Sequence, residues 1–456
     1  MSLGKARSPN GGVCSRRVIG KRPLDPVSME SVVSRENMLR AWKQVRANQG
    51  APGVDGITVT EFRSYAKTHW EGIKTSLLNG TYRPDPVKRV EIPKDTGGTR
   101  KLGIPNVMDR LIQQAISQVL SPVFDPHFSE SSFGFRPKRS AHQAVQKVVK
   151  DIQGGYRYAV EIDLDKFFDS VDHDVLMSRV SRRIRDKGIL RLIGRYLRAA
   201  VVVNGRLNKT SKGVPQGGPL SPLLSNILLD DLDKELEKRG HRFARYADDL
   251  TILVKSRRAG ERGMASIGRF LERKLKVAVN TDKSRVVKAE ECNFLGLTFT
   301  RKRLTVSEKA LTRFKSKLRR LSGRSWGVSM QRRYEEIRPY VQGWMNYFRI
   351  ALKYNDAVEV DHWLRRRIRM CYWKQWRRTR RRIAELIRLG APRHHAILTG
   401  LSRKGYWHLA KTLSTNCGLG NEFLQRQATR SSSAPICSWS SRSACIASLW
   451  PGAPRL

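Results

Sequence analysis

Cysteine is scarce in this chain of 456 residues, and none of the six cysteines forms a Cys-x-x-Cys pair. They are Cys14, Cys292, Cys371, Cys417, Cys437 and Cys445. Zinc ribbons need closely spaced pairs, and small secreted folds need a disulfide framework, so the spacing argues against both classes. Scattered single cysteines fit a reducing compartment, and a cytoplasmic location is expected.

Long hydrophobic runs are also missing. No run approaches the roughly 20 apolar residues that a membrane-spanning helix needs. The start of the chain, Met1 to Arg22, is basic but lacks the apolar core of a secretory signal. No internal repeat is present either. A membrane protein, a secreted protein and a repeat array are therefore not expected.

Acidic residues are few beside the basic ones. The chain has 40 Asp and Glu against 88 Lys and Arg, a formal net charge of +48. Such an excess repels itself in a compact protein and favours a polyanionic partner, above all nucleic acid. The imbalance is largest between residues 301 and 410, where 29 Lys and Arg face 7 Asp and Glu, a net charge of +22.

Two adjacent acids interrupt this basic background in the tetrapeptide Tyr246-Ala247-Asp248-Asp249. Apolar runs flank it on both sides, which predicts a strand, a tight turn and a second strand. Two carboxylates held at a hairpin tip offer the hard oxygen ligands that magnesium prefers. For this motif alone, a solvated acidic turn remains the alternative interpretation.

A second acidic motif runs upstream through Tyr158-Ala159-Val160-Glu161-Ile162-Asp163-Leu164. The period of two in a strand places Val160, Ile162 and Leu164 on one buried face and Asp163 on the other. If this strand lies beside the hairpin, Asp163 and Asp248 meet at one point. Two metal ions about 4 Å apart could then clamp an in-line phosphoryl displacement. The nearby Asp165, Asp169 and Asp172 are expected to be surface or helix-capping acids.

A glycine-rich segment, Gly213 to Pro222, separates the two acidic motifs. Its glycines allow the backbone to approach a base or a sugar closely. Ser221 followed by Pro222 predicts the N-cap and first position of a helix. A plain glycine turn is the alternative interpretation.

A helical apolar stripe is predicted farther on by Leu364, Ile368, Cys371 and Tyr372, which lie at i, i+4, i+7 and i+8. Four arginines crowd the remaining faces of this helix: Arg365, Arg366, Arg367 and Arg369. We expect one packed face and one basic face that follows nucleic-acid phosphates, with a solvated charged face as the alternative.

Five motifs in a fixed order resemble those of the reverse transcriptase/maturase encoded by bacterial group II introns. They are Asp163 with Phe167-Phe168-Asp169, then Pro215-Gln216-Gly217-Gly218-Pro219-Leu220-Ser221-Pro222, then Tyr246-Ala247-Asp248-Asp249, then Asn280-Thr281-Asp282-Lys283, then Phe294-Leu295-Gly296-Leu297. Farther on, Gly343-Trp344-Met345-Asn346-Tyr347-Phe348 and Gly405-Tyr406-Trp407 fit the same family. In all, the resemblance covers roughly residues 35–425.

The resemblance implies an α+β fold, the right-hand polymerase, whose palm sheet is antiparallel and whose thumb, the maturase domain, is α-helical. It also implies a division of the chain into parts. These are a basic flexible arm (1–34), fingers and palm (35–300), a helical thumb or maturase domain (301–385), a basic C-terminal segment that binds DNA (386–425) and a Ser/Pro-rich, disordered tail (426–456).

The family also implies roles for single residues. The acids Asp163, Asp248 and Asp249, with the backbone of Leu164, would bind two Mg²⁺ ions, and Lys283 would protonate the pyrophosphate. The nucleotide would meet Lys94 and Arg100 at its triphosphate, Phe168 as a gate against the ribose 2′-hydroxyl, and Gln216. Phe294, Leu295 and Gly296 would form the primer grip. Intron RNA would bind the arginines of the thumb: Arg365, Arg366, Arg367, Arg369, Arg377 and Arg378.

These roles imply an RNA-directed DNA polymerase that copies its intron RNA, aids splicing and supports retrohoming. Its partners would be intron RNA, a DNA target and primer, and deoxynucleoside triphosphates, with a homodimer left open. Two alternatives remain: a catalytically silent RNA-binding splicing cofactor, and a non-intron reverse transcriptase of a defence or diversity-generating element. The intact acids favour catalysis over the first alternative, and the maturase-like thumb argues against the second.

The end of the chain departs from the family. Nothing in it resembles the His-Asn-His endonuclease that many relatives carry, so cleavage of the second DNA strand is not expected. After Gln427 the chain turns Ser-rich, where relatives keep an apolar, aromatic stretch. A frameshift is one explanation, and it puts the DNA-binding role of this end in doubt.

Overall fold

The computed structural model describes residues 27–93, 98–203, 205–208, 210–300 and 303–430. It divides into two compact units. One comprises the stretches up to 138, 164–239 and 266–280, and the other comprises 139–163, 240–265 and 281 onward. Both units mix helices with sheets, and the C-terminal part is helical, so the α+β class is confirmed. Among the described residues, no helix is both long and apolar enough to cross a membrane.

The first unit packs helices beside one four-stranded sheet. Its helices are α1 (Met29–Val32), α2 (Arg35–Asn48), α3 (Phe62–Leu78), α4 (Val107–Phe124), α6 (Phe167–Ser170), α7 (His173–Val180), α8 (Lys187–Leu197) and α9 (Ser221–Lys238). The sheet has the order β2-β1-β4-β5, from Thr99–Ile104, Val87–Pro93, Val201–Val203 and Arg206–Asn208. Helix α4 is the centre of the core, because most of its side chains are buried and α2 packs along it.

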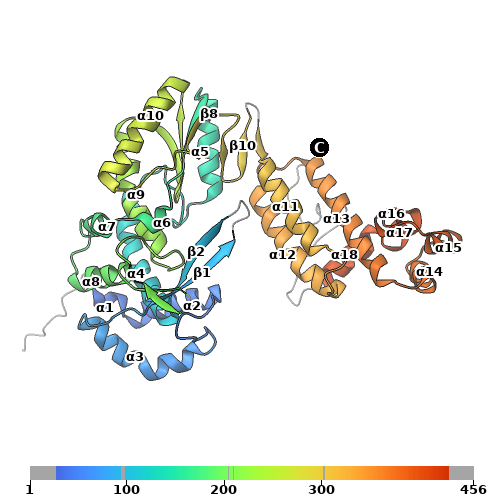
Figure 1. Cartoon of the computed structure of the whole chain (residues 1–456), viewed down its shortest axis with the longest axis horizontal. Helices are drawn as coiled ribbons and strands as arrows, with labels where there is room; N and C mark the ends of the chain where they lie inside the picture. Colours follow the sequence, from blue (N-terminus) through green and yellow to red (C-terminus); the bar gives the residue numbers. More distant parts are fainter. Residues whose placement is uncertain (1–26, 94–97, 204, 209, 301–302, 431–456) are drawn as a thin grey trace, which may run out of the picture. The chain divides into compact units, whose positions relative to one another are not determined.

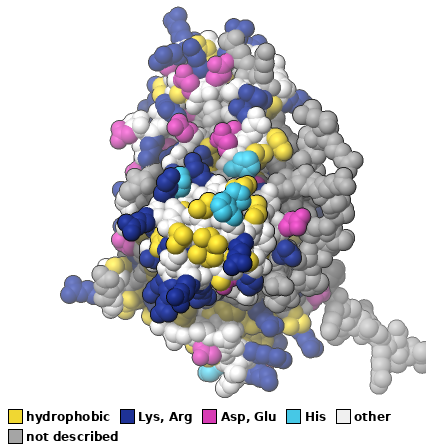
Figure 2. Space-filling model, turned by 90° about the vertical axis from the view of Figure 1, so that its right-hand side faces the viewer, with side chains coloured by type: hydrophobic (Ala, Val, Ile, Leu, Met, Phe, Trp, Pro, Cys, Tyr) yellow, Lys and Arg dark blue, Asp and Glu magenta, His cyan; other side chains and the backbone are white. Residues whose placement is uncertain are grey.

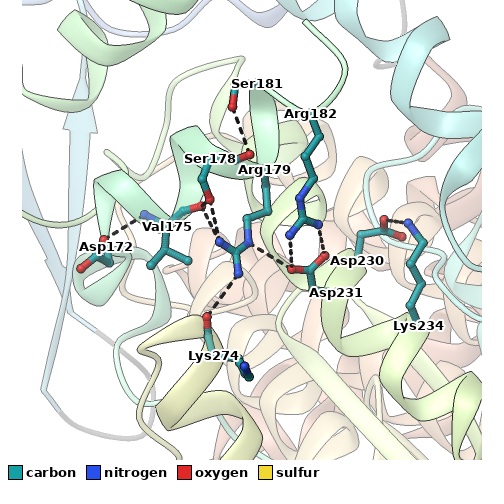
Figure 3. Close-up of polar contacts among 10 residues, drawn as sticks. All are labelled: Asp172, Val175, Ser178, Arg179, Ser181, Arg182, Asp230, Asp231, Lys234 and Lys274. Carbon is teal, nitrogen blue, oxygen red and sulfur yellow. Dashed lines mark hydrogen bonds and ion pairs between the residues drawn. The ribbon is translucent and has the colours of Figure 1, made fainter.

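A short helical turn, Asp125–His127, follows α4, and a π-helix, Leu271–Leu275, follows α10 (Arg257–Phe270). Figure 3 shows how α7, α9 and the π-helix are tied together by polar contacts. Asp231 of α9 accepts from Arg179 Nε at 3.0 Å and from Arg182 Nη1 at 2.6 Å. Arg179 also donates to the carbonyl of Lys274 at 3.3 Å. These bonds fix the π-helix against α7.

The second unit contains a four-stranded sheet with the order β6-β7-β3-β8, which we call the palm sheet. Its strands are Arg242–Tyr246, Asp249–Val254, Tyr158–Ile162 and Arg285–Lys288, and every neighbouring pair is antiparallel. Helix α5 (Ala141–Gln153) packs against β6 and β7 (Figure 1). A smaller antiparallel sheet follows, from β9 (Asn293–Phe294), β10 (Leu297–Phe299) and β11 (Leu304–Val306).

The rest of the second unit is helical and shares one apolar core. Its helices are α11 (Glu308–Leu321), α12 (Met330–Phe348), α13 (Tyr354–Gln375), α14 (Thr379–Arg388), α15 (Arg393–Leu401), α16 (Tyr406–Leu409), α17 (Leu413–Gly418) and α18 (Asn421–Arg430). The fully buried Trp373 of α13 lies in this core with Leu386 of α14 and Leu424 of α18. Because one core joins α11 to α18, the predicted boundary at 385/386 cuts α14 and has no structural counterpart.

The observed helix bounds differ from three further expectations. The flexible arm was predicted to reach residue 34, but α1 begins at Met29, and Met29 and Val32 are buried. Residues 1–26 lie outside the described part of the chain. Ser221 was expected to be a helix N-cap, yet Leu220 occupies that position, and Ser221 Oγ donates to the carbonyl of Pro215 at 2.7 Å. The tail predicted from residue 426 starts inside α18, and residues 431–456 lie outside the described residues.

Candidate active site

The acids of the two motifs lie at the same end of the palm sheet. Strands β3 and β7 are antiparallel neighbours, with Ile162 paired to Leu250. If this register is continued by one residue, Asp163 lies opposite Asp249. Asp248 lies in the turn that precedes Asp249. Asp248 is half-buried and Asp249 is exposed. The hairpin and the outward-facing Asp163 thus have the geometry that the sequence predicts, since Val160, Ile162 and Leu164 are buried.

The turn that carries Asp248 has an unusual backbone. Tyr246 pairs with Asp249, so Ala247 and Asp248 alone connect the two strands, and Ala247 has a φ of 58°. A residue with a Cβ rarely adopts this left-handed region, and such strain clusters at functional sites. Arg245 is 1% exposed and donates from Nη1 to the carbonyl of Ala247 at 2.9 Å. This buried bond holds the turn in its strained conformation.

The backbone at Asp163 is fixed from the neighbouring strand. Its N–H donates to Ser284 Oγ at 3.1 Å, and Ser284 precedes β8. Beside it, Lys283 Nζ lies 3.5 Å from Asp163 Oδ2. Both side chains are well exposed, so the pair contributes little to stability. The contact does bring the expected proton donor to the end of the sheet where the acids lie.

The donor set suits magnesium in its chemistry. Asp163, Asp248 and Asp249 supply carboxylate oxygens, with a backbone carbonyl at Leu164, and hard cations prefer such ligands. Within the described stretches, no three His, Cys, Asp or Glu side chains stand close enough to hold a metal ion. The palm acids match the ion by ligand type and lie at one end of the sheet, but they do not form such a group of three.

Three of the expected nucleotide contacts, Arg100, Phe168 and Gln216, belong to the first unit. The carbonyl of Phe168 accepts from the N–H of Val214 at 2.6 Å, and the carbonyl of Gln216 accepts from the N–H of Gly103 at 2.7 Å. The glycine-rich loop is thereby tied to α6 on one side and to β2 on the other. Gly217 has a φ of 123° and a Cβ there would meet the carbonyl oxygen of Gly103 at 2.5 Å, so the loop requires glycine at this position.

Phe168 and Gln216 are half-buried, and Arg100 of β2 is exposed. Lys94 lies outside the described residues. The structure thus joins the loop of Gln216 to Phe168 within the first unit, and the acids and Lys283 to one end of the palm sheet within the second. Of the acids expected to play no catalytic part, Asp172 accepts from the N–H of Val175 at 3.0 Å and caps α7.

The expected primer grip forms a turn between β9 and β10. Phe294 is buried, Leu295 has a φ of 55° and Gly296 a φ of 78°. Tyr347 of α12 donates from its hydroxyl to the carbonyl of Leu295 at 3.1 Å. Burial, and then the charges of Tyr246 and Asp249, raise the pKa of Tyr347. Tyr347 therefore joins α12 to the turn that is expected to grip the primer, close to the acidic hairpin.

We expect Tyr347→Phe to weaken the grip without unfolding the protein. The change removes one hydrogen bond to a strained turn, and such bonds contribute about 1 kcal/mol. The KM for primer–template should rise roughly fivefold at nearly constant kcat, since about 1 kcal/mol corresponds to that factor. Steady-state primer extension measures both constants. Tyr354→Phe is the matched control, because Tyr354 is 63% exposed at the start of α13; an equal effect in both variants would contradict the role of Tyr347.

The arginines expected to bind RNA do not share one open face. Arg365 is 5% exposed and pairs with Asp361 one turn earlier on α13, so it does not lie on the open basic face that the sequence predicts. Arg366 stacks on Trp407 with its Cζ 3.8 Å from the ring centre, and Arg367 donates to Ser322 Oγ at 2.6 Å. Arg377 and Arg378, beyond the end of α13, are exposed.

The end of the helical part formed by α14 to α17 is shown in Figure 2. There, Lys and Arg side chains surround a group of hydrophobic and His side chains. The exposed apolar residues of these helices include Leu398, Leu401 and Leu413, each between 57% and 61% exposed. Arg380 and Arg381 of α14 are exposed as well. Exposed basic residues thus lie on the helices after α13 as well.

Sequence reasoning missed two residues of this site, Arg245 and Tyr347. Arg245 precedes the acidic motif directly, but a charged residue inside a strand carries no local signal of burial. Tyr347 lies in a motif that was used only to recognise the thumb. Its bond to Leu295 spans 52 positions of the chain, which no local pattern encodes.

Comparisons with known proteins agree with this arrangement. Residues 92–299 match the family described as reverse transcriptase (RNA-dependent DNA polymerase), and residues 311–388 match the group II intron, maturase-specific domain. Protein YkfC of Escherichia coli (strain K12) is 32% identical over 314 residues, which are 60% of this chain and 82% of YkfC.

A second relative is the group II intron-encoded protein LtrA of Lactococcus lactis subsp. cremoris, which is 39% identical over 195 residues. These cover 42% of this chain and 32% of LtrA, so the match spans about a third of that relative's length. A solved partial Cas6-RT-Cas1–Cas2 complex matches with a TM-score of 0.35 and 24% identity, over 54% of this chain and 42% of that one. That score is too low to carry an argument.

Proposed function

Because this chain belongs to the family of group II intron reverse transcriptases and maturases, we propose that it copies its intron RNA into DNA and promotes splicing of that RNA. Its class is RNA-directed DNA polymerase, by the family that residues 92–299 match. One observation supports catalysis most directly. Asp163 and the Asp248-Asp249 hairpin lie on neighbouring strands at one end of the palm sheet.

The metal site we propose consists of Asp163, Asp248, Asp249 and the carbonyl of Leu164, which would hold two Mg²⁺ ions. When bound, such ions activate the attacking primer hydroxyl and stabilise the leaving pyrophosphate. The protein's own part is to fix these oxygens. Arg245 holds the hairpin turn, and Ser284 holds the backbone of Asp163. Lys283, next to Asp163, would donate a proton to the pyrophosphate.

Nucleotide binding is proposed for the first unit. Arg100 and Lys94 would hold the triphosphate, since guanidinium and ammonium groups pair with phosphate oxygens. Phe168 would exclude a ribose 2′-hydroxyl, and Gln216 would contact the nucleotide. The hydrogen bonds from Val214 to Phe168 and from Gly103 to Gln216 support this proposal, because they connect the two residues through one loop.

RNA binding is proposed for the helical part, with intron RNA as the partner and a role in retrohoming beside a DNA target. The match of residues 311–388 to the maturase-specific domain supports this function. The same match disfavours a non-intron reverse transcriptase of a defence or diversity-generating element. Arg377 and Arg378 are exposed and available to phosphates, whereas Arg365 is buried and paired with Asp361.

The direct test is a primer-extension assay on an RNA template with a DNA primer, deoxynucleotides and Mg²⁺, run beside a splicing assay on the cognate intron RNA. We expect extension that needs Mg²⁺ and that prefers deoxynucleotides to ribonucleotides. We also expect splicing at low Mg²⁺ to depend on the protein. Splicing without extension would point to the silent splicing cofactor instead.

A further inference from the structure

A cavity of about 320 Å³ opens in the helical part between α13 and the segment that leads from α17 into α18. Its lining residues are His362, Arg365, Arg369, Asn416 and Asn421. None of these described lining residues is acidic, and none is apolar. These residues offer hydrogen-bond donors and positive charge but no apolar surface. The cavity therefore does not suit an apolar ligand or a metal cation.

The charges at this cavity are not balanced. Arg365 is paired with Asp361, and both side chains are almost fully buried. Arg369 lies one turn farther along α13, and its hydrogen bonds go to neutral groups. Its Nε donates to the carbonyl of Leu419 at 2.9 Å, and its Nη1 donates to Asn416 Oδ1 at 2.5 Å. One carboxylate thus faces two guanidinium groups.

The excess positive charge at this cavity favours the binding of an anion. Arg369 is half-buried, and burial together with the charge of Arg365 lowers its pKa. A guanidinium in such surroundings is stabilised by an anion that accepts its remaining N–H groups. In the described part of the chain, Arg369 Nη2 has no hydrogen-bond partner, and neither has the side-chain amide of Asn421.

The opposite wall adds to the attraction for an anion. Asn421 is the first residue of α18, a helix of ten residues, so the free N–H groups and the positive end of the helix dipole lie at this rim. His362 lies exposed at the cavity as well. The Arg369 guanidinium, the Asn421 amide and a helix N-terminus together suit a tetrahedral oxyanion, because each supplies hydrogen-bond donors and no carboxylate is among the described lining residues.

We propose that this cavity binds a phosphate group, supplied by the backbone of the bound RNA. The choice of RNA rests on the proposed function, whereas the phosphate chemistry rests on the cavity alone. A free inorganic phosphate has the same chemistry, and the test separates the two sources. Arg365 lines this cavity but is neutralised by Asp361, so Arg369 carries the positive charge that an anion would meet.

The test uses the full-length protein with Asn421→Asp, which places a carboxylate at the rim of the cavity. An acid in the first turn favours a helix, so α18 should remain folded. The matched control is Asn355→Asp, the same change of charge in the first turn of α13, at an exposed residue outside the cavity. Arg369→Gln is a second variant that removes the unbalanced charge, and thermal unfolding checks that each variant folds.

Two measurements are made on each protein: RNA affinity as a function of salt, and the shift of Tm with inorganic phosphate against chloride at equal ionic strength. We expect Asn421→Asp and Arg369→Gln to bind RNA about tenfold more weakly than Asn355→Asp, since a charge-assisted contact contributes roughly 1.4 kcal/mol. The slope of log affinity against log salt should fall in magnitude by about 0.7 to 0.9, as the loss of one phosphate contact demands.

The two measurements distinguish RNA from free phosphate as the source of the bound group. A loss in the RNA arm supports the site with RNA as its source. A phosphate-dependent rise in Tm that both cavity variants lose, with unchanged RNA binding, supports the site with free phosphate as its source. If both variants equal Asn355→Asp in both arms, the proposal is overturned. Primer extension by the wild-type protein is scored separately, so a failure of the polymerase function leaves this result readable.

Discussion

Asp248→Asn should reduce kcat for primer extension at least about 10³-fold, equivalent to roughly 4 kcal/mol of transition-state stabilisation. The side chain keeps its size but loses the negative oxygen that a magnesium ion needs at the hairpin tip. RNA affinity should stay within about twofold, since one charge changes in a chain of net charge +48. Primer extension, RNA binding and splicing are measured on the same preparation.

Asp174→Asn is the matched control for this variant. Asp174 is an exposed acid in α7, outside the palm sheet, and the substitution changes charge and size in the same way. The control should extend primers as the wild type does. A parallel loss of extension and splicing in Asp248→Asn, with both retained in Asp174→Asn, would contradict a separation of the two activities between the palm acids and the helical part.

The local parts of this site could be predicted from the sequence because they depend on short periods. The alternation of apolar residues predicts which face of the Asp163 strand is buried. The apolar runs on both sides of Tyr246 to Asp249 predict the hairpin. Both are confirmed by the pairing of β3, β6 and β7. A period of two fixes the face of a strand whatever lies against it.

The helical part was harder to predict, because periodicity shows which residues of a helix are apolar but not which polar ones later helices will cover. The sequence of α13 alone predicts that Arg365 and Arg369 are exposed. In the structure, Arg369 donates to Leu419, fifty positions farther along the chain, and Arg365 is buried with Asp361. Ser221 shows the same limit on a smaller scale, since its contact with Pro215 replaced the expected cap.

The RNA affinity of the whole protein should fall steeply with salt, and this is the second large effect we expect. The helical part carries nearly half of the excess charge, with a net charge of +22 between residues 301 and 410 out of +48 for the whole chain. A surface that neutralises six to ten phosphates releases the counterions of those phosphates. For such contacts, affinity drops by about 10³ to 10⁵ between 50 and 200 mM salt.

Filter binding or fluorescence anisotropy on the cognate intron RNA, at constant Mg²⁺, measures this slope. Exposed side chains beyond α13 should account for part of it: Arg377→Gln and Arg378→Gln together should lower the slope by roughly 1.4 to 1.8, two contacts at about 0.7 to 0.9 each. Arg365→Gln should leave the slope nearly unchanged or unfold the protein, because its guanidinium already neutralises Asp361. A loss of affinity below about tenfold over the whole salt range would reject phosphate binding as the main source of RNA affinity, and would shift the explanation to the stacked aromatic residues such as Trp407.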